Sequence, residues 1–187
     1  MTILEIVFGP MFSGKTTKLI DTYEKLLKQG EKPIIINYKG DIESTETMLK
    51  NHDNKIVNCI SYYKLRTGWT DKNDVNYEII HNSKYILINE CQFFEDLYEI
   101  VLLMLNTKNV YIYGLDSDYM QRKFGQVWDL IPHANSVIKL TARCSNCNSK
   151  YAIFTNRIFT GEPLQQILIG VKYYEVLCRD CKNKLVK

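Results

Sequence analysis

The sequence contains no long apolar run, no strong excess of charge, and no repeated or low-complexity tract. A membrane-spanning helix needs about 20 consecutive apolar residues, and no stretch approaches that length, so we expect no membrane partner. With 24 lysines and arginines against 21 aspartates and glutamates, the charge balance indicates no nucleic-acid partner. The first residues carry no basic segment followed by an apolar stretch, which argues against a secretory signal and predicts a cytoplasmic protein.

At 187 residues, the chain can bury a proper core, and we expect one main domain with a small appendage. Four of its six cysteines form two C-x-x-C pairs, and four thiolates at this spacing can surround one Zn²⁺ ion tetrahedrally. A closed shell of thiolates leaves no open position for chemistry, so we expect a structural Zn²⁺ ion. Its ligands would be Cys144, Cys147, Cys178 and Cys181. The remaining cysteines are predicted to be small buried hydrophobes: Cys59 and Cys91.

A glycine-rich motif of the form G-x-x-x-x-G-K-T follows an apolar run at residues 3–8 and precedes a helical pattern. In this context, successive backbone N–H groups converge on phosphate oxygens, the lysine reaches the β and γ phosphates, and the threonine approaches Mg²⁺. The motif predicts a nucleotide phosphate site but does not distinguish a kinase from a motor ATPase or a switch. The predicted phosphate-binding residues are Gly9, Pro10, Met11, Phe12, Ser13, Gly14, Lys15 and Thr16.

Strands and helices are predicted to alternate along the chain, which indicates an α/β fold with a mainly parallel sheet. A short β-branched run at residues 34–38 and apolar runs at residues 85–88 and 110–113 are typical of parallel strands covered on both faces. Helices are expected from the motif to a stop at Gly30, and at residues 97–105; a further helix is expected around residues 75–80.

The polar segment 40–58 predicts a mobile surface loop with at most one helical turn, and a brief strand is expected around residues 56–60. Ligands of parallel sheets bind beyond the carboxyl ends of the strands. The residues expected to gather at that edge are Gly9, Asp41, Asn89, Glu90, Leu115 and Asp116.

The order of motifs resembles the type II thymidine kinases, the zinc-containing class found in cells, bacteria and large DNA viruses. The shared features are the glycine-rich loop, segments 89–94 and 114–119, and the two cysteine pairs with segment 174–177 before the second pair. The resemblance implies a P-loop-type, mainly parallel α/β sheet flanked by helices, with a small C-terminal zinc-binding lasso domain. We therefore expect a nucleotide-binding domain over residues 1–141 and a zinc-ribbon or lasso domain over residues 142–187.

The resemblance also implies transfer of the γ-phosphate of ATP to the 5′-hydroxyl of deoxythymidine, with Glu90 as general base. Mg²⁺ would accompany ATP, held by Thr16 and Asp41. Beside the loop, the ATP site would include Asp41, Asn89 and Gln92. The thymidine site would include Met11, Phe93, Leu115, Tyr119 and Tyr174, with backbone groups of Gln166, Ile167, Leu168, Ile169 and Gly170. By the same resemblance, we expect a homotetramer that is inhibited by thymidine triphosphate.

Three residues depart from the family's pattern. Asn89 stands where the family normally has Asp, and a neutral amide is a poorer partner for hydrated Mg²⁺ than a carboxylate. Glu43 stands where the family often has Arg, which would remove one positive charge from the phosphates. Cys91 replaces a glycine and is expected to crowd the turn after Glu90.

The spacing of the segment before the second cysteine pair leaves Tyr173 as a rival to Tyr174 for the lasso role. The departures keep a second hypothesis open, a catalytically weakened nucleotide-binding relative of thymidine kinase. A third is a P-loop ATPase with a zinc ribbon that moves along nucleic acid. It would need a basic stripe interleaved with aromatic residues and a second motor domain, and the sequence shows neither.

Overall fold

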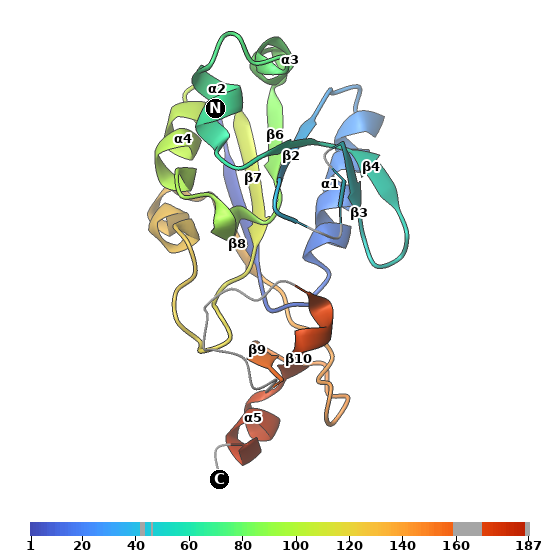
Figure 1. Ribbon diagram of the computed structural model, residues 1–187. Helices are drawn as coiled ribbons and strands as arrows, with labels where there is room; N and C mark the ends of the chain where they lie inside the picture. Colours follow the sequence, from blue (N-terminus) through green and yellow to red (C-terminus); the bar gives the residue numbers. More distant parts are fainter. Residues whose placement is uncertain (42–43, 46, 159–169, 186–187) are drawn as a thin grey trace.

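The computed structural model describes residues 1–41, 44–45, 47–158 and 170–185. An α/β body occupies most of the chain, and a smaller C-terminal part lies beyond one end of its sheet (Figure 1). Two of the sequence expectations, those on Glu43 and on Gln166 to Ile169, fall outside the described residues. Among the residues described, no helix is both long enough and apolar enough to cross a membrane.

The described part of the α/β body contains a six-stranded sheet with the order β5-β2-β6-β7-β1-β8. Every neighbouring pair is parallel, which confirms the predicted mainly parallel sheet. Because all strands point the same way, their carboxyl ends share one edge. The strands are β1 (Leu4–Phe8), β2 (Ile34–Tyr38), β5 (Ile60–Tyr62), β6 (Tyr85–Ile88), β7 (Asn109–Gly114) and β8 (Ser136–Lys139).

Helices cover both faces of the sheet, which explains why β6, near its centre, is apolar along its whole length. Leu87 of β6 packs with the helix that follows the glycine-rich loop, whereas Ile86 and Ile88 pack in the cluster on the opposite face. Figure 1 shows α1 on one side of the sheet and α2 and α4 on the other. The helices of the body are α1 (Lys15–Lys28), α2 (Leu65–Thr70), α3 (Tyr77–Asn82), α4 (Leu97–Met104) and the 3-10 helices η1 (Cys91–Phe93) and η2 (Val127–His133).

The predicted stop of α1 is confirmed by its hydrogen bonds. The N–H of Gly30 donates to the carbonyl of Leu27 at 3.0 Å, and the N–H of Glu31 donates to that of Leu26 at 3.1 Å. This pair of bonds is a Schellman motif, in which a glycine just beyond the helix satisfies the last carbonyls.

The prediction of a loop over residues 40–58 is partly wrong. Strands β3 (Met48–Lys50) and β4 (Ile56–Asn58) form an antiparallel hairpin, and no helical turn occurs among the described residues of this segment. Leu49 is 1% exposed and packs in the α1-side cluster, and the side chain of Asn51 donates to Thr17 of α1 at 3.1 Å. One buried leucine within a polar segment provides too weak a pattern to reveal this hairpin from sequence.

The C-terminal part is built on a two-stranded antiparallel sheet of β9 (Phe154–Arg157) and β10 (Tyr174–Leu177). The 3-10 helix η3 (Val171–Tyr173) precedes β10, and α5 (Arg179–Leu185) follows it. The apolar cluster of this part is small, and Cys144, Cys178 and Cys181 belong to it. A cluster of this size needs a cross-link to be stable.

Candidate active site

The glycine-rich loop lies between the carboxyl end of β1 and the start of α1. Gly14 precedes α1 in a left-handed conformation with φ of 83°, and its carbonyl accepts the N–H of Lys18 at 2.9 Å. The N–H of Met11 donates to the hydroxyl of Thr155 at 3.0 Å, which ties the loop to β9 of the C-terminal part. The predicted order of strand, loop and helix is therefore present, with the helix N-terminus directed at the loop.

Lys15 is buried beneath the loop and donates to the carbonyls of Gly9 at 3.2 Å and Pro10 at 2.7 Å. Burial lowers the pKa of its ammonium group, and the charges of Glu90 and Asp116 oppose that shift. The ammonium group therefore lies within electrostatic reach of two carboxylates at the ends of neighbouring strands.

Asp116 was expected at the same edge, and it follows the carboxyl end of β7 there. Its carboxylate accepts from Lys139 of β8 at 2.6 Å, and its carbonyl accepts the indole N–H of Trp128 at 2.8 Å. Asp116 is only 3% exposed. It acts on Lys15 through its field and does not line the cavity.

Glu90 follows β6 with φ of 50° and ψ of 40°, in the left-handed region. This conformation costs a non-glycine residue about 1–2 kcal/mol, and such strain persists where surrounding contacts enforce it, often at functional sites. The amide of Gln92 provides one such contact, because its Nε2 donates to Glu90 Oε2 at 2.5 Å. Gln92 Oε1 in turn accepts the N–H of Leu115 at 2.9 Å.

Cys91 was expected to crowd the turn after Glu90, and the structure instead accommodates it in the core. A Cβ atom on Gly114 of β7 would lie 2.4 Å from the Cys91 sulfur, so the missing side chain on β7 makes room for the thiol. Burial, together with the charge of Glu90, raises the pKa of Cys91. Both Cys59 and Cys91 are buried, as predicted.

Asn89 is buried at the end of β6 and forms hydrogen bonds with a neighbouring amide. Its Nδ2 donates to Oδ1 of Asn37 at 2.8 Å, and Nδ2 of Asn37 donates to the carboxylate of Asp41 at 3.1 Å. Asn89 is therefore connected to Asp41 by two hydrogen bonds through Asn37. Of these three residues, Asp41 is the one that lines the cavity.

The loop, the strand ends and the C-terminal part enclose a cavity of about 430 Å³, within the range of ligand sites. Of the residues predicted for the ATP and thymidine sites, Gly9, Pro10, Asn89 and Gln92 do not line it, and Gln166 to Ile169 are not among those described. The predicted residues that do line it are Met11, Phe12, Ser13, Gly14, Lys15, Thr16, Asp41, Glu90, Phe93, Leu115, Tyr119, Gly170 and Tyr174.

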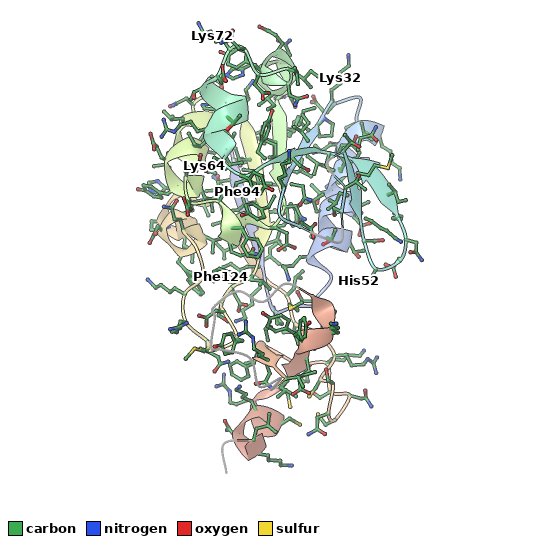
Figure 2. All side chains as sticks on the ribbon, in the orientation of Figure 1. Lys32, His52, Lys64, Lys72, Phe94 and Phe124 are labelled. Carbon is green, nitrogen blue, oxygen red and sulfur yellow. The ribbon has the colours of Figure 1, made fainter. Side chains whose placement is uncertain are left out.

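An aromatic group that sequence reasoning missed lies around Phe93. Its ring stacks on Tyr38 at 5.0 Å between centroids and meets Phe124 edge to face at 5.4 Å. Both neighbours line the cavity, and Figure 2 labels Phe124 at the end of the body that faces the C-terminal part. Tyr38 ends the apolar run of β2, so its position on the sheet edge was a usable signal. Phe124 lies in a connecting segment that has no such pattern.

Arg157 of β9 joins two tyrosines of the cavity. Its guanidinium group lies 4.0 Å from the ring centroid of Tyr119 and donates to the hydroxyl of Tyr174 at 2.9 Å. Tyr174 lines the cavity, and its rival Tyr173 does not. The guanidinium group lies over the ring of Tyr119 and is hydrogen-bonded to the hydroxyl of Tyr174, so it fixes both rings. The two tyrosines together form one wall of the cavity.

The four predicted zinc ligands lie together, with sulfur atoms within 4.8 Å of one another. The sulfurs of Cys147 and Cys178 are 3.7 Å apart, and thiolates about 2.3 Å from a tetrahedral Zn²⁺ ion are separated by about 3.8 Å. Burial raises the pKa of Cys144, but backbone N–H groups, including that of Cys178, outweigh burial and lower it. The donor set therefore fits a closed, structural Zn²⁺ site.

Oxygen donors line the cavity beside Lys15. Thr16 and Asp41 both line it, and their side chains carry oxygen atoms of the hard kind that Mg²⁺ binds together with waters and phosphate oxygens. The residues present therefore have the chemistry that Mg²⁺ with ATP requires.

The structure defines an α/β protein with a mainly parallel sheet, a glycine-rich loop at the carboxyl edge of that sheet, and a C-terminal cluster of four cysteines that could bind zinc. Comparison with known proteins narrows this class. The family model described as thymidine kinase matches residues 2–182, and the chain belongs to the thymidine kinase family.

Curated relatives come from plants, animals and viruses. The chain is 33% identical over 178 residues to thymidine kinase a of Arabidopsis thaliana, covering 94% of this chain and 73% of the relative. It is 35% identical over 179 residues to the thymidine kinase of Variola virus, covering 95% of each. It is 31% identical over 182 residues to the cytosolic thymidine kinase of Homo sapiens, covering 97% of this chain and 73% of the relative.

Proposed function

We propose that this chain is an ATP-dependent thymidine kinase that transfers the γ-phosphate of ATP to the 5′-hydroxyl of deoxythymidine. The observation that carries the proposal is that Glu90, in a strained backbone conformation, lines the same cavity as Lys15 and an aromatic wall. A kinase needs a phosphate-binding cation, a proton acceptor and a slot for the nucleoside within reach of one another.

Phosphoryl transfer forms a bond between the nucleoside O5′ and the γ-phosphorus and breaks the bond to the β,γ-bridging oxygen, releasing ADP. Glu90 accepts the proton of the 5′-hydroxyl as the phosphoryl group arrives. Lys15, released from the carbonyls of Gly9 and Pro10, neutralises charge on the β and γ phosphates. Bound Mg²⁺ would neutralise the same phosphates, held by Thr16 and Asp41.

The thymine ring is proposed to occupy the slot between Phe93 and the Tyr119–Tyr174 wall, because a flat apolar pocket suits a methylated pyrimidine. Met11 and Leu115 complete this slot, and Gly170 with Gln166 to Ile169 would supply backbone hydrogen bonds to the base edge. Tyr174 is the proposed lasso tyrosine because its ring lines the cavity.

Gly9 and Pro10 are proposed to act through their backbone, as part of the loop around the phosphates. A homotetramer, inhibition by thymidine triphosphate and a cytoplasmic location complete the proposal, and each is supported by family membership. The two-domain division at residues 141 and 142 is supported by the end of β8 at Lys139 and by the separate apolar cluster of the C-terminal part.

The test is an assay with γ-labelled ATP, Mg²⁺ and thymidine, with labelled thymidine monophosphate as the readout. We expect turnover by the natural chain and a loss of at least about 100-fold in kcat for Glu90→Gln, since the amide cannot accept the proton. ATP binding by Glu90→Gln should be retained. Binding of both ligands without turnover by the natural chain would instead support the catalytically weakened relative.

A further inference from the structure

The buried amides of Asn37 and Asn89 form a matched pair at the carboxyl edge of the sheet. They are 1% and 2% exposed. Strands β2 and β6 pair in register up to Ile36 and Ile88, and the N–H of Asn89 donates to the carbonyl of Ile36 at 2.8 Å. The side chains of Asn37 and Asn89 thus lie one residue beyond the paired part of β2 and β6. Because both are buried, water does not compete for the hydrogen bond between them.

The direction of these hydrogen bonds is set by the carboxylate at the end of the chain. A carboxylate oxygen accepts hydrogen bonds and does not donate them, so Asn37 must turn its NH₂ group toward Asp41. Its carbonyl oxygen then faces residue 89, which must be a donor. Asparagine meets this demand at position 89, and an ionised aspartate does not.

An aspartate at position 89 would create a conflict that no rotation of Asn37 removes. With Asn37 as it stands, two acceptor oxygens would face each other in a buried place. If the Asn37 amide turned over, its oxygen would face Asp41 instead, and Asp41 would lose the donor. Buried polar groups left in such contacts are unfavourable.

From this geometry we infer that Asn37 and Asn89 are positioning residues. They hold the carboxylate of Asp41 toward the cavity and make it the acidic ligand of Mg²⁺ there. The inference rests on the proposed function for its substrate and deepens it. Asn89 is, on this account, an adaptation to Asn37 rather than a lost metal ligand. Oxygen ligands of metals are commonly oriented by hydrogen bonds from a neighbouring group, and loss of that group weakens metal binding by about 10–100-fold.

The experiment measures the Mg²⁺ concentration needed for half-maximal binding of a non-hydrolysable ATP analogue, by calorimetry, without thymidine. We expect Asn89→Asp to raise this concentration by about tenfold, although the substitution adds a carboxylate. The matched control is Asn109→Asp. Asn109 is also buried and uses its side-chain oxygen to accept the N–H of Ile3 at 3.1 Å, so an aspartate there keeps the native bond, far from the cavity.

A second comparison separates positioning from direct metal binding. Asp41→Asn sets the reference for loss of the carboxylate, and adding Asn89→Asp to it should produce no further change in the Mg²⁺ requirement, because residue 89 acts through Asp41. If Asn89→Asp does not fold, as judged by its thermal unfolding, Asn37→Leu removes the donor to Asp41 with little change in volume and should raise the requirement to a similar extent.

An unchanged or lowered Mg²⁺ requirement in Asn89→Asp, or in Asn37→Leu where the first variant does not fold, would overturn the inference. So would an additional effect of Asn89→Asp in the Asp41→Asn background. The result is independent of the kinase assay: a raised requirement in a chain that does not phosphorylate thymidine would support the role of the amides and refute the proposed function.

Discussion

The side-chain amide of Gln92 forms hydrogen bonds with both the carboxylate of Glu90 and the backbone of Leu115. The backbone contact determines the orientation of this amide. The N–H of Leu115 can only donate, so Gln92 Oε1 faces it and the NH₂ group faces Glu90. Gln92 was expected in the ATP site, and it does not line the cavity. Its contacts indicate that it orients the proposed base.

The first prediction concerns Gln92→Met, which keeps the volume and removes both hydrogen bonds. We expect kcat to fall by about 100-fold as Glu90 loses its orientation, with the KM for ATP little changed. Stability should fall by about 1–3 kcal/mol, because the N–H of Leu115 is left without its acceptor. Steady-state kinetics and denaturant unfolding measure the two effects.

Gln126→Met is the matched control, since Gln126 also accepts a backbone N–H, that of Tyr98 at 2.8 Å. This hydrogen bond of Gln126 is made to α4 and not to Glu90. A loss of stability without a loss of kcat is expected there. Equal kcat values for Gln92→Met and the control would argue against an orienting role.

Tyr113 carries a buried phenol whose ionisation links stability to pH. Burial is the main cause that raises the pKa of Tyr113, and the bond from its hydroxyl to Thr22 at 3.0 Å opposes the shift. Above the ordinary tyrosine pKa of 10.0, the unfolded chain releases this proton and the folded chain retains it. Unfolding is therefore favoured as the pH rises, and the effect is absent below that pKa.

We predict that Tyr113→Phe flattens the alkaline loss of stability by about 1 kcal/mol per pH unit above about pH 10. The measurement is the free energy of unfolding in urea between about pH 8 and pH 11, which spans the ordinary tyrosine pKa. Tyr151→Phe, at a side chain that is 75% exposed, is the control and should follow the natural chain. Parallel curves for Tyr113→Phe and the natural chain would contradict the prediction.

The segment before η2 packs against the turn that carries Glu90, and Gly125 makes that approach possible. Gly125 has φ of 66°, and a Cβ atom there would lie 2.4 Å from the carbonyl oxygen of Gln92. A side chain therefore meets backbone that cannot move without displacing η1 (Cys91–Phe93). The position of η1 thus depends on close backbone packing between two segments far apart in the chain.

Gly125→Ala and Gly30→Ala form a matched pair, because Gly30 has φ of 80° and a Cβ atom added there would meet no atom within 4 Å. We expect Gly30→Ala to cost about 1 kcal/mol from backbone conformation alone. Gly125→Ala should cost about 1–3 kcal/mol more through the clash. It should also lower kcat, because η1 carries Gln92. Chemical unfolding and the kinase assay test both points; equal costs would contradict the account.

The α/β body and the C-terminal part meet at the cavity. The bond from Met11 to Thr155 and the lining of the cavity by both the loop and Tyr174 make the site dependent on the C-terminal part. That part has a small apolar cluster around the cysteines, so its structure should depend on the metal.

We predict that removing Zn²⁺ with a chelator abolishes thymidine binding while the affinity for ATP falls by less than about tenfold. The proposed thymidine slot has one wall on β9 and β10, whereas the proposed phosphate site is built on the α/β body. Calorimetry with each ligand, alongside the measured zinc content, tests this, and re-adding Zn²⁺ should restore binding. Zinc-free protein that binds thymidine normally would refute it.

The elements that sequence reasoning found were those with strong local patterns. The loop and the apolar strands β1, β2, β6 and β7 follow from runs of residues that are adjacent in the chain, and so do the cysteine pairs. Strand β3 was missed because Leu49 is the only buried hydrophobic residue in it. Phe124 was missed because nothing local marks a residue that packs against Phe93 from a distant segment.

The amino-acid sequence by itself determined the fold class, the glycine-rich loop, the four-cysteine cluster and the place of Glu90 at a strand end, because neighbouring residues and their spacing encode each of these. Tertiary structure alone decided the strained backbone of Glu90, the bond from Gln92, and the pairing of Asn37 with Asn89, which lie 52 residues apart. The physical reason is that the role of a buried amide depends on which group faces it, and only the packing of separate strands brings those groups together.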